Sequence, residues 1–227
     1  FRPALALTVA PHLTVEANGV PRLLVSLSPR LRWEALVVRQ LRGTELKRFL
    51  RRYRKTRPPE RSIVFLLQSV EYPVNVGSIF RIADACGVEE VILCGITPTP
   101  PNPTIAKVAR GKEQRVPWRY VKEATQALAE LRDEGFRLCA LEITDEAVPY
   151  FAYEPPERVC LVVGHEDHGL TRATLALCDD ALFVPMYGKG RSLNVHVSLA
   201  VVAYHIRCWE GHASQPEEAT TGLLGST

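Results

Sequence analysis

The stretch Val184-Pro185-Met186-Tyr187-Gly188-Lys189-Gly190-Arg191-Ser192-Leu193-Asn194-Val195 decides how the rest of this chain is organised. An apolar strand runs into a glycine-rich turn, and the turn opens a long apolar helix that we expect from Val195 to about Trp209. Glycine permits the positive φ values that a tight turn requires, and Ser192 and Asn194 are residue types that cap helices. Free backbone N–H and C=O groups at such a turn suit a small polar ligand. Taken alone, the stretch is explained equally well as a structural turn.

Strands and helices alternate in the residues before this stretch. Strands are predicted at 63–67, 91–94, 138–143, 159–163 and 182–185, and helices at 76–86, 104–110, 121–134 and 171–177. Such alternation predicts an α/β fold, with a parallel sheet flanked by helices on both faces.

The composition excludes several classes of protein. The 227 residues are 46% hydrophobic and 23% charged, which is typical of a soluble globular domain. The 6 cysteines are far apart and form no C-x-x-C pair, which favours buried thiols in a reducing cytoplasm over disulfides or a zinc site. No apolar run approaches the roughly 18 residues of a membrane span. We therefore predict a cytoplasmic protein without a membrane segment.

A second prediction concerns a basic helix from Thr44 to Lys55, which is followed by Pro58-Pro59. Its apolar residues recur at helical spacing, and residues 39–57 carry nine Lys and Arg against the single acid Glu45. This density indicates a surface that contacts the phosphate backbone of RNA or DNA, although a solvated helix face is the alternative. The candidate RNA-binding residues are Arg48, Arg51, Arg52 and Lys55.

Four segments follow from these patterns. Residues 1–43 are an uncertain N-terminal segment interrupted by prolines, and residues 44–59 form the basic helix and a linker. Residues 60–210 form the main domain, and the polar residues 211–227 are expected to be a disordered tail. The chain starts with Phe1 and its only methionine is Met186, which is typical of a fragment or a processed chain.

Three polar patches follow predicted strands, at the sheet edge where parallel α/β proteins bind ligands. The first contains Asn75, Gly77 and Arg81, the second is Gly164 to Leu170, and the third is the opening stretch. Each has a plain alternative, since Asn75 could simply cap a helix and Arg81 could be a surface charge. The second patch offers His165, Glu166 and His168 as metal ligands, but a loop provides no i, i+4 pair, and we predict no metal. The usual glycine fingerprints of dinucleotide and phosphate loops are missing.

Together, the three patches resemble the motifs of one family. The ordered set N-x-G-x-x-x-R (Asn75 to Arg81), G-x-E-x-x-G-L (Gly164 to Leu170) and P-M-x-G-x-x-x-S-L-N-V (Pro185 to Val195) is similar to the SpoU (TrmH-type) branch of the SPOUT RNA methyltransferases. The resemblance extends from about Arg61 to Trp209. It implies that the C-terminal part of the α/β domain is threaded into a deep trefoil knot, an exception to the rule that chains avoid knots.

The resemblance also implies a function. Such enzymes are homodimers joined through the knot region, and they transfer a methyl group from S-adenosylmethionine to a ribose 2′-hydroxyl of tRNA or rRNA. The residues expected to line the cofactor site are Leu141, Gly164, Val184, Met186, Ser192 and Leu193. Arg81 is implied as the catalytic arginine, with Asn75, Glu166 and Asn194 orienting it and the ribose.

Arg81 could act as the base, but a guanidinium has a pKa above about 12 and is costly to deprotonate. We therefore favour a role in holding a phosphate and stabilising the developing alkoxide. The alternatives are a non-catalytic RNA-binding protein that keeps the fold, and a nucleotide-dependent enzyme on an open doubly wound sheet. The intact set of polar residues argues against the first, and the missing glycine fingerprint argues against the second.

Overall fold

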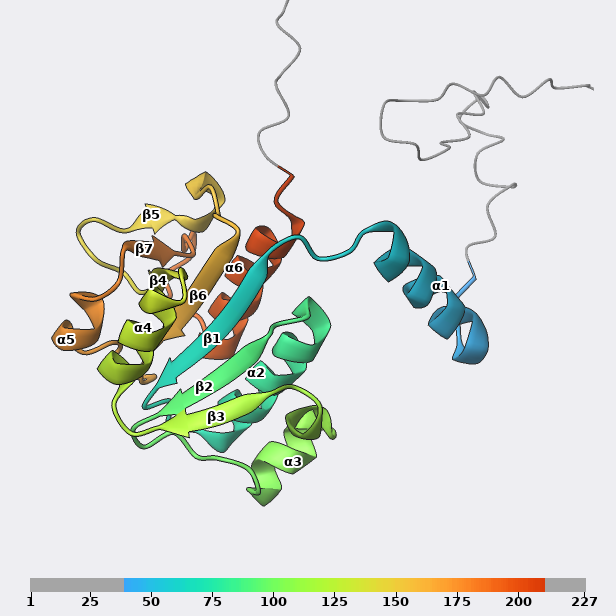
Figure 1. Cartoon of the computed structure of the whole chain (residues 1–227), viewed down its shortest axis with the longest axis horizontal. Coiled ribbons are helices and arrows are strands. Elements are labelled where there is room, and N and C mark those ends of the chain that lie inside the picture. Colours follow the sequence, from blue (N-terminus) through green and yellow to red (C-terminus); the bar gives the residue numbers. More distant parts are fainter. Residues whose placement is uncertain (1–38, 211–227) are drawn as a thin grey trace, which may run out of the picture. The chain divides into compact units, whose positions relative to one another are not determined.

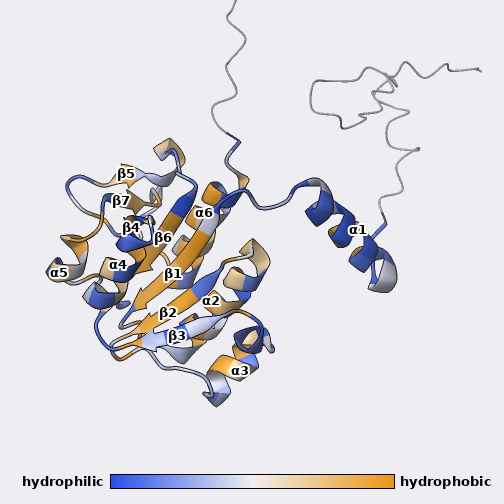
Figure 2. Ribbon diagram, in the orientation of Figure 1, coloured by the Kyte–Doolittle hydropathy of each residue, from blue (hydrophilic) through white to orange (hydrophobic). Residues whose placement is uncertain are grey.

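The computed structural model describes residues 39–210, so most of the predicted segment 1–43 and all of the predicted tail 211–227 lie outside the described residues. The chain divides into two compact units between Thr56 and Arg57. The first contains α1 (Gly43–Thr56), which confirms the predicted basic helix. None of the residues of α1 is buried. Figure 2 shows this helix as mainly hydrophilic.

The second unit is built on a seven-stranded sheet in the order β3-β2-β1-β6-β4-β7-β5. All six strand pairs are parallel, which confirms the predicted sheet. In chain order the strands are β1 (Ser62–Gln68), β2 (Glu90–Cys94), β3 (Trp118–Val121), β4 (Arg137–Leu141), β5 (Val148–Pro149), β6 (Arg158–Val163) and β7 (Asp180–Phe183).

Two strands were missed in the sequence, and both lie at the edges of the sheet. The expected helix at 121–134 was wrong at its start, because residues 118–121 form β3 and α4 (Ala124–Asp133) begins only afterwards. No residue of β3 or of the two-residue β5 is buried. Such short, half-exposed strands lack the apolar run by which a buried strand is recognised.

Helices cover both faces of the sheet, as predicted (Figure 1). On one face, Ile63, Phe65 and Leu67 of β1 pack with residues of α2 (Pro73–Cys86), α3 (Pro103–Ala109) and α6 (Val195–Cys208). On the other face, Val64 and Leu66 pack with α4, and α5 (Arg172–Leu175) lies beside α4. The apolar colouring of the strands in Figure 2 matches this burial on both faces.

Helix α2 begins earlier than expected, at Pro73 rather than Val76, and is capped after Cys86 by Gly87, which has φ of 65°. Proline suits the first turn because its missing N–H would have no partner there. A Cβ on Gly77 would lie 2.8 Å from the Cβ of Val108. Gly77 therefore allows the backbone of α2 to approach α3 closely.

Helix α6 begins directly after Asn194 and ends near α2. Arg207 near its C-terminus donates to the backbone oxygens of Cys86 and Gly87 at 2.7 and 3.0 Å. These bonds satisfy carbonyls that the end of α2 leaves free. The predicted fold class is confirmed, and the threaded knot stays a prediction.

Candidate functional site

A cavity of about 940 Å³ opens at the edge where the parallel strands end. Its walls come from the start of α2 and from the segments that follow β4, β6 and β7. Strands β1, β6, β4 and β7 are consecutive in the sheet, so the loops after them meet at one place. Small-molecule sites commonly measure about 300–1,000 Å³. The cavity at the sheet edge that the sequence indicated is therefore large enough to hold a cofactor.

The structure brings the predicted cofactor residues together in this cavity. All six line it: Leu141, Gly164, Val184, Met186, Ser192 and Leu193. Three of the four predicted catalytic residues line it as well: Asn75, Glu166 and Asn194.

Two glycines shape the wall that follows β6. A Cβ on Gly164 would lie 2.3 Å from the carbonyl carbon of Gly169, a separation that real structures do not show. Gly169 itself has φ of +64°, and a Cβ there would lie 2.2 Å from a carboxylate oxygen of Glu142. The intervening turn is closed by backbone bonds of 3.1 and 2.8 Å between His165 and Gly169. Glycine is thus required at Gly164 because backbone fills the space of a side chain, and at Gly169 because of the positive φ.

Glu166 projects from that turn and is held by groups at the start of α2. Asn75 donates its side-chain amide to one carboxylate oxygen at 2.6 Å, and the backbone N–H groups of Glu71 and Tyr72 donate at 2.9 and 3.3 Å. Burial raises the pKa of Glu166, but these hydrogen bonds outweigh it and hold the pKa below its ordinary value. Asn75 does not cap the helix as its alternative reading suggested, since α2 begins at Pro73 and Asn75 lies inside the first turn.

Two polar residues of the site were missed in the sequence. His196, in the first turn of α6, places Nδ1 2.9 Å from Oδ1 of Asn75, and burial lowers its pKa. Glu142 follows β4 and accepts backbone N–H groups of Ile143 and Leu170 at 3.0 and 3.1 Å. A polar residue in the first turn of an apolar helix was a signal for His196. Glu142 had the weaker signal of an acid directly after a strand.

Comparison with known proteins identifies the family. The sequence matches the model of the SpoU rRNA Methylase family over residues 62–204. These residues contain the whole sheet and most of α6. The chain belongs to the SpoU rRNA methylase family.

Individual members of the family resemble the chain over its main domain. The tRNA (guanosine(18)-2′-O)-methyltransferase of Escherichia coli K12 is 33% identical over 138 residues, which is 61% of this chain and 59% of the relative. The chain thus spans about three fifths of the length of the curated relatives it matches. Among solved structures, the A. aeolicus TrmH/SpoU tRNA modifying enzyme is 27% identical with a TM-score of 0.59, over 71% of this chain and 82% of that one. An RNA 2′-O ribose methyltransferase is 28% identical with the same TM-score, over 66% and 57%.

Arg81 is the candidate catalytic residue that does not line the cavity of this SpoU-family domain. It is exposed on α2, six residues after Asn75 and therefore about 9 Å further along the helix axis. Asn194 occupies the N-cap position of α6, but its side chain makes no capping hydrogen bond. Only its backbone oxygen accepts from the first turn of α6, from the N–H groups of Val197 and Ser198. Because the side-chain amide is not used in capping, it is available to a ligand.

The remaining candidates lie elsewhere or form different contacts. The candidate RNA-binding residues Arg48, Arg51, Arg52 and Lys55 are all exposed on α1, which belongs to the other unit. Within residues 39–210, no group of three or more His, Cys, Asp and Glu side chains is arranged to hold a metal ion. His165 instead contacts Glu71 at 3.2 Å and lies against the ring of His168. Among the helices of the described residues, none has both the length and the apolar character needed to cross a membrane.

Proposed function

We propose that this chain is an RNA methyltransferase that uses S-adenosylmethionine and modifies a ribose 2′-hydroxyl of tRNA or rRNA. One observation carries the proposal: nine of the ten candidate catalytic and cofactor residues line a single cavity at the strand ends of a SpoU-family domain. The name of the Escherichia coli relative describes 2′-O-methylation of a guanosine in tRNA, which supports this reaction class.

The donor set of the cavity fits the proposed cofactor. Leu141, Val184 and Leu193 provide apolar surface for a flat base, and Gly164 contributes backbone to the cavity wall where the turn after β6 packs closely against it. The carboxylates of Glu142 and Glu166 provide negative charge on the same walls, which suits a ligand that carries positive charge. When bound, S-adenosylmethionine supplies a methyl group on a positively charged sulfur, which is open to attack by an oxygen nucleophile.

The residues of the chain then have to place a ribose oxygen in line and assist the loss of its proton. Glu166 is a poor proton acceptor because three donors already occupy its carboxylate and lower its pKa. We assign it, with Asn75 and Asn194, to orienting the ribose. Arg81, on the exposed side of α2, holds the neighbouring phosphate and stabilises the alkoxide as it forms.

The proposal includes a partner and a compartment. We expect a homodimer formed through the knot region and α6, on which Val197 and Tyr204 are 37% and 46% exposed. The basic helix α1 would hold the RNA backbone. All six cysteines are free thiols and four of them are buried, which supports a reducing cytoplasm.

Two measurements test the proposed function. The 2′-O-methyl positions of total RNA are mapped with and without the gene, and loss of a position is the expected result. Binding of S-adenosylmethionine to the purified chain is measured by calorimetry. The proposal would fail if the chain bound RNA but not S-adenosylmethionine, and if no 2′-O-methyl position depended on the gene. The chain would then be the non-catalytic RNA-binding protein.

A further inference from the structure

His196 connects the third polar patch of the sequence to the first two. Its Nδ1 lies 2.9 Å from Oδ1 of Asn75, and Nδ2 of Asn75 lies 2.6 Å from Glu166. The three side chains come from α6, from α2 and from the turn after β6. A single line of hydrogen bonds therefore joins the three segments that build the cavity.

The direction of these bonds follows from the carboxylate. Ionised Glu166 can only accept, so Asn75 must present its NH₂ group to Glu166 and its oxygen to His196. If the amide were reversed, two oxygen atoms would face one another at 2.6 Å without a proton between them. The oxygen of Asn75 accepts, so Nδ1 of His196 must carry a proton.

The line is anchored at its far end and buried in its middle. Glu166 also accepts the backbone N–H groups of Glu71 and Tyr72, which fixes the carboxylate to the start of α2. Asn75 is only 9% exposed, so its oxygen would lose hydration without a donor at His196. Removal of the histidine would leave this amide free to turn away from Glu166.

We propose that His196 is a positioning residue that fixes the Asn75 amide and, through it, the Glu166 wall against which the ribose is placed. It acts through Asn75, because Asn75 and Glu166 line the cavity whereas His196 does not. The inference rests on the proposed methyltransferase function for its effect on rate. Its hydrogen-bond geometry can be tested without activity.

The kinetic test compares two substitutions at the same position. His196→Phe keeps the ring but removes the donor, and kcat should fall by about 10- to 100-fold while Kd for S-adenosylmethionine stays within about twofold. His196→Asn places an amide N–H close to the position of Nδ1, and it should restore most of the lost kcat. Equal kcat values for the wild type and His196→Phe would overturn the inference, as would loss of kcat without rescue by asparagine.

A histidine on the same helix provides the matched control. Nε2 of His205 lies 2.9 Å from the backbone oxygen of Tyr153, and neither residue lines the cavity. His205→Phe should lower the melting temperature with little effect on kcat. A comparable fall of kcat in this variant would mean that any lost histidine bond on α6 impairs the enzyme, and the positioning role would be rejected.

Nitrogen NMR of the full wild-type chain at about pH 8, where free imidazoles are neutral, tests the geometry directly. His196 should show the Nδ1–H tautomer, and His205 should show the Nε2–H tautomer because it faces a carbonyl oxygen. An Nε2–H tautomer at His196 would overturn the inference whatever the activity. A chain with the expected tautomers that transfers no methyl group to RNA would instead contradict the proposed function.

Discussion

At the scale of single residues, Glu166 shows how a carboxylate is retained in a partly apolar cavity. Burial disfavours its charge, and the charge persists because one side-chain amide and two backbone N–H groups donate to it. A carboxylate held in this way is a fixed anion and a weak base. The developing charge on the ribose therefore requires a cation, and Arg81 is our candidate.

Arg81→Ala should separate chemistry from cofactor binding. Because Arg81 is exposed on α2 and does not line the cavity, we expect methyl transfer to fall by about 100-fold or more while Kd for S-adenosylmethionine changes less than about twofold. Single-turnover methylation and calorimetry measure the two quantities. Arg81→Lys keeps the charge but loses the planar guanidinium, so its rate of methyl transfer should lie between those of the wild type and Arg81→Ala. A parallel loss of both quantities would remove the assigned role.

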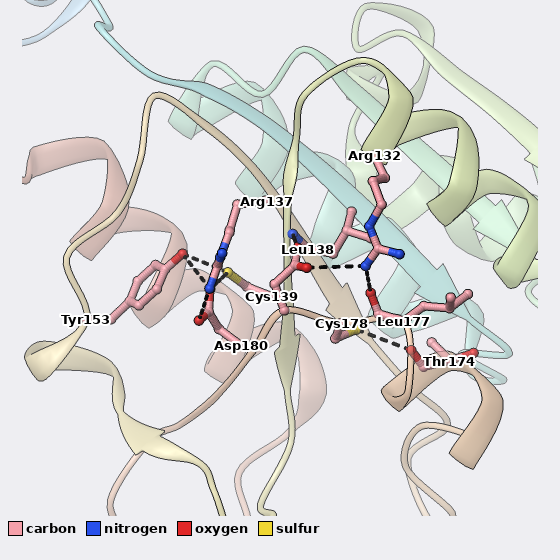
Figure 3. A network of polar contacts seen from close by, with 10 residues as sticks. Arg132, Arg137, Leu138, Cys139, Tyr153, Thr174, Leu177, Cys178 and Asp180 are labelled. Carbon is pink, nitrogen blue, oxygen red and sulfur yellow. Dashed lines mark hydrogen bonds and ion pairs between the residues drawn. The ribbon is translucent and has the colours of Figure 1, made fainter.

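At the scale of elements, β4 and β7 are joined at their starts by a polar network away from the cavity (Figure 3). Arg137 donates two hydrogen bonds to Asp180, at 2.8 and 2.9 Å. The buried hydroxyl of Tyr153 lies 3.3 Å from the same carboxylate and 2.9 Å from the thiol of Cys139. Arg137 holds the pKa of Asp180 below its ordinary value. This network secures β7, and the cavity-lining loop begins directly after that strand.

Asp180→Asn should destabilise the chain in a way that depends on pH. The folded pKa of Asp180 lies below its unfolded value, so the charged pair contributes stability above about pH 4 and loses it as pH falls further. We expect a loss of about 1–2 kcal/mol at pH 7, limited because Arg137 is half exposed. Urea unfolding at neutral and at acidic pH checks this, with the exposed Asp133→Asn as control. If the difference in free energy of unfolding between the wild type and Asp180→Asn were as large at acidic pH as at neutral pH, the ionic explanation would be contradicted.

The basic helix α1 should make RNA binding depend on salt concentration. Arg39 is paired with Glu45, but Arg48, Arg51 and Arg52 are exposed on the following turns. Replacing these three by Gln should weaken RNA binding and reduce the slope of log K against log salt by about 2–3, since each phosphate contact contributes roughly 0.7–0.9. Replacement by Lys preserves the charge and should preserve the slope. An unchanged slope in the Gln variant would make α1 an ordinary solvated helix.

At the scale of the whole molecule, the proposed dimer can be tested through α6. Tyr204 is 46% exposed, and Tyr204→Glu should place a charge in the interface and convert a dimer to a monomer with impaired methyl transfer. Light scattering during gel filtration gives the mass. Ile96→Glu changes a 64% exposed apolar residue outside α6 and should leave the dimer intact. A wild-type chain that is monomeric at micromolar concentration would exclude the dimer.

Local sequence patterns predicted the βα alternation, the basic helix and the polar patches after the strands, because each depends on local periodicity or on a short turn. The order of the strands could not be read from it. Strand β6 inserts between β1 and β4, and only this placement brings the three patches to one cavity. The edge strands β3 and β5 depend on pairing partners distant in the chain.

The contact of His196 with Asn75 spans 121 residues, and the steric role of Gly77 depends on Val108 of another helix. Such contacts leave no local periodicity, since both partners are ordinary within their own segments. The polar patches that follow β1, β6 and β7 in this SpoU-family chain were therefore predictable, whereas Glu142 after β4 was missed. The bonds that hold them in place were decided by tertiary packing.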